Sequence, residues 1–165
     1  MIVRVSKTLM VLSVALFSTL VVFNNIVDYG TNFAFVQHVS QMDTVFSQQQ
    51  AAWRSISSPV IHHLSYVLII LWESLIAVLC WIGSIHLWQR IDNYSAFNKA
   101  KKCAIAGLTA GILLWFTGFI AIGGEWFLMW QSDHWNGQEA ASRFVMIFGI
   151  LLIYLNTPDC DENAS

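Results

Sequence analysis

The chain of 165 residues is 56% hydrophobic and only 11% charged, with a net charge of −2 and a mean hydropathy of +0.58. Soluble domains usually carry about a quarter charged residues, so this composition excludes an ordinary soluble enzyme. The lack of a basic excess also gives no surface for nucleic acid. We therefore expect the lipid bilayer and other membrane proteins as partners.

Four apolar runs are long enough to cross a bilayer, which requires about 20 mainly apolar residues in a helix. They cover residues 8–27, 63–88, 103–127 and 140–156. The sequence therefore predicts an all-α fold, a polytopic four-helix membrane bundle that forms one domain over residues 1–158, followed by an acidic cytoplasmic tail at 159–165. The first run exceeds the apolar length of a signal peptide and no cleavage site follows it, so we expect it to be retained.

Lysine and arginine residues lie unevenly along these predicted spans. Six basic residues are expected on one side of the bundle, namely Arg4, Lys7, Arg90, Lys99, Lys101 and Lys102. Only Arg54 and Arg143 are expected on the other side. The positive-inside rule then predicts that both termini are cytoplasmic. The three cysteines, Cys80, Cys103 and Cys160, fall on the cytoplasmic side, where we expect free thiols.

The long outer loop, residues 28–62, contains the pattern of an amphipathic helix. Its apolar positions recur at helical spacing and are Phe35, Val36, Val39, Met42 and Phe46. Such a helix lies along the membrane surface or caps the bundle. Because it lacks the lysines and arginines of a lipid-binding surface helix, we expect a lid packed on the protein.

The second span places Glu73 about ten residues inside the membrane. At 100° per residue, one narrow face carries His62, Tyr66, Glu73, Ala77 and Cys80, and a face this polar is not expected to meet lipid. No arginine or lysine in any span matches the depth of Glu73. Its carboxyl suits a hydrogen-bond donor, a proton relay, or a contact with a quinone or lipid; the alternative is a structural hydrogen bond to a backbone carbonyl or to Tyr66.

The third span is expected to pack through its glycines. Counting back from Glu125, one helical face carries Gly118, Leu114, Gly111 and Gly107, and the GxxxG pair of Gly107 and Gly111 allows a neighbouring backbone to approach closely. Glu125 should then point inward at the outer end of this face.

Arg143, one turn into the fourth span, should lie at a similar depth to Glu125, so we predict an ion pair between them. Two interpretations stay open. The pair either fixes only the helix register, or it forms the floor of a periplasmic-side site with Glu73, Tyr66 and His62. A charge inside a membrane span is costly and usually pairs, faces the interior or marks function.

Metal and cofactor sites are not favoured by the spacing of the five histidines. A bis-histidine haem needs imidazoles from two helices at one depth, but only the second span contains histidine. We therefore predict no resident metal or cofactor, with haem and quinone as less favoured alternatives. The tryptophans fit an aromatic belt at the outer interface. A candidate outer-surface site comprises Asp28, Asn32, His38, Asp43, Trp126 and Trp130.

Three segments resemble a known family. They are NNIVDYGTNFAFVQHVSQMDT, SYVLIILWESLIAVLCWIG and GLTAGILLWFTGFIAIGGEWFLMWQSDHWNGQEAASRF, and they resemble the bacterial predicted small integral membrane proteins, a four-span domain of unknown function. The resemblance extends to Thr157 and implies a four-helix protein of the bacterial inner membrane, without implying any catalytic residue.

Two functional hypotheses follow, and neither requires catalysis. The chain contains no nucleophile or phosphate-loop motif. We expect an accessory or scaffold subunit of a membrane complex, which binds other subunits or itself through the Gly107 and Gly111 face. The alternative is a periplasmic-side binding or transfer protein that handles a quinone, lipid or proton in a pocket lined by Glu73, Glu125 and Arg143.

Overall fold

The computed structural model describes residues 1–46 and 50–160, which are helical apart from short connections. Four helical stretches have the length and apolar composition to cross a membrane, which confirms the predicted four-span bundle. In chain order the elements are α1 (Ile2–Val27), α2 (Tyr29–Gln41), η1 (Ala52–Arg54), α3 (Pro59–Gln89), α4 (Tyr94–Ala100), α5 (Lys102–Ile112), η2 (Leu113–Trp126), η3 (Met129–Gln131) and α6 (Gln138–Asn156).

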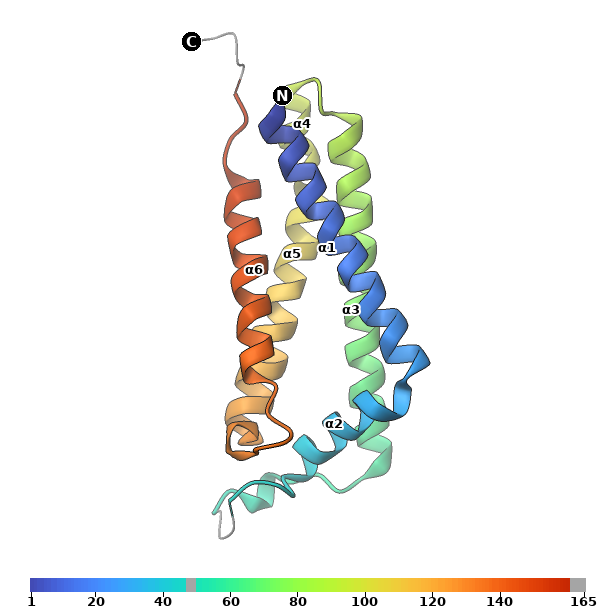
Figure 1. Cartoon of the computed structure of the whole chain (residues 1–165), viewed down its shortest axis with the longest axis vertical. Helices are drawn as coiled ribbons and strands as arrows, with labels where there is room; N and C mark the ends of the chain where they lie inside the picture. The colour runs from blue at the N-terminus through green and yellow to red at the C-terminus, as the bar shows by residue number, and fades with distance from the viewer. Residues whose placement is uncertain (47–49, 161–165) are drawn as a thin grey trace.

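The spanning helices pack in a ring in which each contacts its neighbours, but the two ends of the bundle differ (Figure 1). α1 packs on α3, α3 packs on α5, and α6 packs on both α5 and η2. The buried core includes Ala15 of α1, Leu87 of α3, Leu108 of α5 and Leu155 of α6. At the end nearest α2, two pairs of helices diverge (Figure 1). One pair is α1 and α3, and the other is η2 and α6.

Glycines set the close approach of helices in the closed part of the bundle. A Cβ on Gly107 would lie 2.7 Å from the Cys80 Sγ of α3, and one on Gly111 would overlap the Phe148 ring of α6. The two predicted packing glycines therefore do pack, but inside the chain's own bundle. Neighbouring helices of the same chain cover this face at both glycines, and self-association through it stays a prediction.

Two other glycines depart from the sequence prediction. A Cβ on Gly118 would meet only the Leu114 side chain, at 3.7 Å, so Gly118 does not mediate helix packing. Gly83 does so instead, because a Cβ there would lie 2.7 Å from the backbone nitrogen of Ala104. Gly83 has no small partner four residues away, and for that reason the GxxxG pattern does not reveal it.

The third span changes from an α-helix to a π-helix at Leu113. The i→i+5 pattern continues to its end, where the Phe127 N–H donates to the Ile122 carbonyl at 3.0 Å. A π-helix holds more residues per turn than the 3.6 of an α-helix. Side-chain directions beyond Leu113 therefore lag behind those expected at 100° per residue.

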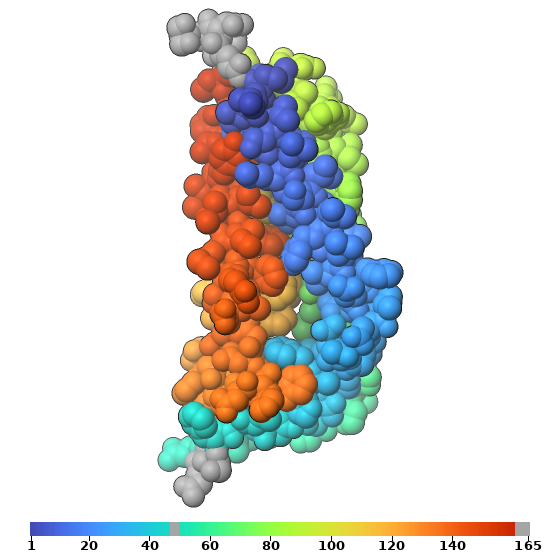
Figure 2. All heavy atoms as spheres, in the orientation of Figure 1, coloured from blue at the N-terminus to red at the C-terminus, as the bar shows by residue number. Residues whose placement is uncertain are grey.

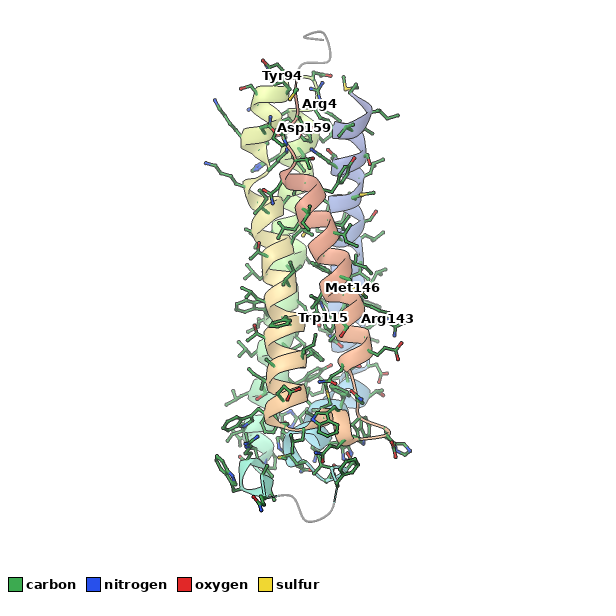
Figure 3. All side chains as sticks on the ribbon, turned by 90° about the vertical axis from the view of Figure 1, so that its left-hand side faces the viewer. Arg4, Tyr94, Trp115, Arg143, Met146 and Asp159 are labelled. Carbon is green, nitrogen blue, oxygen red and sulfur yellow. The ribbon has the colours of Figure 1, made fainter. Side chains whose placement is uncertain are left out.

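At the end of the bundle where α1 begins and α6 ends, Asp159 is buried (Figure 3). Its carboxylate accepts from the Lys7 Nζ of α1 at 2.9 Å and from Lys101 Nζ at 2.6 Å. The Asn98 side chain also donates to the Asp159 carbonyl at 2.9 Å. The predicted tail at 159–165 therefore begins too early, because Asp159 belongs to the bundle; residues 161–165 lie outside the described residues.

Burial alone raises the pKa of Asp159, but hydrogen bonds and positive charge from Lys101 and Lys7 outweigh it and hold this pKa below its ordinary value. Both lysine side chains are buried. We call this group of Lys7, Lys101, Asn98 and Asp159 the terminal clamp. It ties α1 and α4 to the segment that follows α6.

At the opposite end, α2 follows α1 after the single residue Asp28 and crosses beneath the separated helices (Figure 1). The helix expected in this loop is present, although it begins at Tyr29 and ends before Met42, whose φ of 54° is left-handed. The Ile56 N–H donates to the Ser40 carbonyl at 2.9 Å and fixes the returning chain against α2. The membrane side on which α2 lies stays a prediction.

Candidate functional site

A cavity of about 510 Å³ occupies the space between α2, α3 and η2. Figure 2 shows the surface hollowed above α2 on the face between α1 and α6, but neither of these two helices lines the cavity. The residues that line it include Phe35, Val39 and Ser40 of α2, Ser65, Leu68 and Trp72 of α3, and Leu113, Thr117, Gly118 and Ile122 of η2. Its volume falls within the usual range of about 300–1,000 Å³ for ligand pockets.

The cavity opens sideways between α3 and η2. Exposed fractions of its lining side chains are 62% for Leu68, 49% for Leu113, 48% for Ile122 and 36% for Trp72. Both α3 and η2 belong to stretches that are long and apolar enough to span a membrane. None of the described residues that line the cavity is charged. The polar groups of its side chains are the hydroxyls of Ser40, Ser65 and Thr117 and the indole N–H of Trp72, which donates to Ala110.

Aromatic packing holds η2 on α6 and away from α3. The Trp115 ring lies 4.4 Å from the Phe144 ring of α6 and 4.7 Å from Phe119, between ring centroids. The Trp72 Nε1 donates to the Ala110 carbonyl at 3.0 Å and joins α3 to α5 at one end of the gap. Below that bond, Gly118 adds no side chain, and the space stays open.

Glu73, Tyr66 and His62 are all buried, as the shared face of the second span predicts. The partner that the sequence does not identify is Asn25 of α1. Its Nδ2 donates to the Glu73 Oε2 at 2.6 Å, and its carbonyl accepts from the Tyr66 hydroxyl at 3.0 Å. Asn25 looks like part of the polar end of span one, but the antiparallel packing of α1 on α3 brings it to the level of Glu73.

Glu73 does not line the cavity, so the predicted polar site and the observed cavity are separate. His62 Nε2 donates to the Ile56 carbonyl at 2.8 Å and ties the outer loop to α3. The next residue, His63, lies 2.8 Å from the Tyr29 hydroxyl through its Nδ1. These contacts hold α1, α2 and α3 together and need no ligand.

The predicted buried ion pair between Glu125 and Arg143 is wrong. Both residues are exposed, and Arg143 instead lies 3.7 Å from Glu139 on its own helix, with 62% and 88% of the two side chains exposed. Figure 3 shows Arg143 on the outer side of α6. The cause is the π-helix, which turns Glu125 away from the face of Gly107 and Gly111.

The six outer-surface candidates divide among separate contacts. Asn32 is close to Tyr66, and Asp28 joins α1 to α2. His38 Nδ1 lies 2.6 Å from Asp43 Oδ2, while its ring stacks on Trp135. Trp130 packs on Phe46, and Trp126 packs on Trp53. Within residues 1–46 and 50–160, no three His, Cys, Asp or Glu side chains gather in the arrangement that a metal ion requires.

Arg54 lies beside Trp126, close in the chain to Ile56, which lines the cavity. Its guanidinium carbon is 4.8 Å from the centre of the Trp126 ring and 5.6 Å from that of Trp53. Its Nη1 donates weakly to the Trp126 carbonyl, at 3.4 Å, and its Nε has no hydrogen-bond partner among the described residues. From the sequence, Arg54 indicates only membrane orientation, because Trp126, which contacts it, lies 72 positions away in the chain.

Residues 3–158 match the family described as "Predicted small integral membrane protein (DUF2165)". Searches among curated proteins and among solved structures gave no match. The family match covers both the cavity and the Asn25 to Glu73 hydrogen bond, and it stops just before Asp159. The chain therefore belongs to this family of small integral membrane proteins.

Proposed function

We propose that the protein binds the hydrocarbon chain of a membrane lipid in the cavity between α2, α3 and η2. The observation that supports this function is the sideways opening between two spanning helices, rimmed by Leu68, Trp72 and Leu113. A chain entering there stays in an apolar environment along its whole path. Binding by this route requires no charged group to leave water.

An apolar chain suits the lining better than a quinone ring or a proton. A quinone ring needs donors for its carbonyl oxygens, but the lining offers only three hydroxyls, and the Ser40 hydroxyl already donates to the Val36 carbonyl. The carboxyl of Glu73 lies outside the cavity. A lipid therefore remains the expected ligand. Its binding site is the cavity, and Glu73, Glu125 and Arg143 do not form part of it.

The accessory-subunit hypothesis has lost its main structural argument, because Gly107 and Gly111 pack within the bundle. The charge distribution supports placing the protein in a bacterial inner membrane with cytoplasmic termini. In this orientation the cavity lies in the outer half of the bilayer. α2 then covers it from the periplasmic side.

The test is photolabelling of the purified protein with a lipid that carries a diazirine on its acyl chain, followed by mass spectrometry of the labelled peptides. We expect labelling of peptides that contain Leu68, Trp72 or Thr117. Gly118→Leu should remove most of this labelling, because the new side chain projects into the cavity and obstructs it while its Cβ has ordinary room.

The matched control is Gly149→Leu on α6. A Cβ at Gly149 meets no atom within 4 Å, and Gly149 does not line the cavity. This variant should label like the wild type, and the thermal unfolding of both variants verifies that they are folded. Equal labelling of the cavity peptides in folded Gly118→Leu and Gly149→Leu would rule out the proposed function.

A further inference from the structure

We propose that the bound lipid is a glycerophospholipid whose phosphate is held by Arg54 at the outer end of the cavity. This inference rests on the proposed function and names the headgroup chemistry of the same site. Two chain segments place Arg54 close to the cavity. Ile56, two residues after Arg54, lines the cavity, and so does Phe127, which follows the Trp126 that contacts Arg54.

The guanidinium of Arg54 has donors to spare. Arginine carries five N–H donors in a planar fork that matches the oxygens of a phosphate. Within the described residues, the only hydrogen bond that this guanidinium donates is the long one from Nη1 to the Trp126 carbonyl, at 3.4 Å. The two indoles of Trp53 and Trp126 hold the group in place by cation–π contact without using its donors.

The charge of Arg54 is also not neutralised by any acidic side chain in the described part of the protein. The ion pairs there involve Lys7, His38, Lys101 and Arg143. Glu125 precedes Trp126 in the chain but forms no ion pair with Arg54, and Asp43 is occupied by His38. One positive charge is therefore available at the end of an otherwise uncharged cavity.

The surrounding tryptophans fit the level of lipid headgroups. Trp53 is 73% exposed and Trp126 and Trp130 are each 46% exposed, and tryptophans are enriched where a membrane protein crosses the headgroup region. A lipid whose chain lies between α3 and η2 would thus carry its phosphate at the depth of Arg54. An apolar cavity that ends at an uncompensated cation matches an amphiphile with a phosphate head.

The experiment compares two photoactivatable probes with the same acyl chains, a phosphatidylglycerol and a diacylglycerol, on the full-length protein in detergent. Arg54→Gln should weaken binding of the phosphatidylglycerol by roughly tenfold to a hundredfold, the range expected for hydrogen bonds to a charged group. Binding of the diacylglycerol, which has no phosphate, should not change. Arg54→Lys should recover part of the binding, because it keeps the charge and loses the fork.

Arg143→Gln is the matched control, since Arg143 is exposed and lies away from the cavity. Thermal unfolding of each variant separates a binding defect from a folding defect. If folded Arg54→Gln binds both probes like the wild type while Gly118→Leu binds neither, the phosphate site is refuted and the cavity function stands. If Gly118→Leu also leaves both unchanged, the cavity function itself is refuted.

Discussion

The side chain of Asn25 gives the Glu73 carboxyl a hydrogen-bond partner in the middle of the protein. The Asn25 Nδ2 lies 2.6 Å from Glu73 Oε2, and the backbone carbonyl of Asn25 is used by Tyr66. A buried polar group is costly when it has no partner. Asn25 and Glu73 thus satisfy each other and fix the register of α1 on α3.

Replacement of Glu73 should distinguish this hydrogen bond from a need for the acid itself. Glu73→Gln keeps an oxygen that accepts from Asn25, so we expect an unfolding midpoint close to that of the wild type. Glu73→Ala leaves the Asn25 amide unpaired and should cost about 1–3 kcal/mol. Thermal unfolding in detergent measures both. Equal destabilisation by the two substitutions would show that the hydrogen bond is not the stabilising interaction.

Arg143 tests the correction to the predicted ion pair. Because its contact with Glu139 is exposed, Arg143→Ala should change the free energy of unfolding by no more than about 0.5 kcal/mol. Loss of a buried partner would instead cost roughly 3–5 kcal/mol. Denaturation of the wild type and the variant under one condition decides between these values, and a cost in the larger range would restore the buried pair.

At the level of the helices, the closest approach of α3 to α5 depends on Gly83. A Cβ there would lie 2.7 Å from the Ala104 backbone nitrogen and 2.8 Å from its Cα. Backbone atoms cannot rotate aside as a side-chain end can. The two helices must therefore move apart if the position gains a methyl group.

We predict that Gly83→Ala destabilises the protein by about 1–3 kcal/mol, the usual cost of overpacking. Gly149→Ala is the control, because open space surrounds that position and alanine favours a helix over glycine. Their unfolding midpoints should move in opposite directions. A Gly83→Ala variant as stable as the control would show that α3 and α5 have room to separate.

The sequence predicts the helices more reliably than the directions of their side chains. The length of an apolar run predicts a membrane-spanning helix, because a backbone that crosses lipid must form its hydrogen bonds within the helix. The face of Tyr66 and Glu73 is correct because α3 is an α-helix throughout. The inward direction of Glu125 fails because η2 is a π-helix, for which the apolar run gives no signal. Arg54 meets the indole of Trp126 only through tertiary packing, whereas Trp53 is its neighbour in the chain.

For the molecule as a whole, the terminal clamp joins segments from opposite ends of the chain. Asp159 provides one carboxylate to two buried lysines, and the Thr157 carbonyl accepts from both of them. Replacing Asp159 with asparagine leaves these lysines without that counter-charge. Loss of one partner of a buried ion pair costs roughly 3–5 kcal/mol.

The stabilisation from Asp159 should depend on pH in a defined direction. Its pKa in the folded protein is lowered, so its contribution is fully present above the unfolded value of about 3.9 and is lost as the pH falls through the folded value. The difference in unfolding midpoint between wild type and Asp159→Asn should therefore be constant from neutral pH to about pH 5 and then shrink.

The control for this titration is Asp92→Asn, an exposed position in the connection between α3 and α4. Its difference from the wild type should be small throughout. A gap between wild type and Asp159→Asn that persists at the lowest pH would mean that the Asp159 charge does not supply the stabilisation.

The terminal clamp also sets an order of events during synthesis. Lys7 and Asp159 are separated by 152 positions, so at about 5–20 residues per second the ribosome makes Asp159 roughly 8–30 s after Lys7. All four spanning helices are made in that interval. The Lys7 ammonium must therefore stay hydrated during insertion, and α1 completes its contacts only after translation has passed α6.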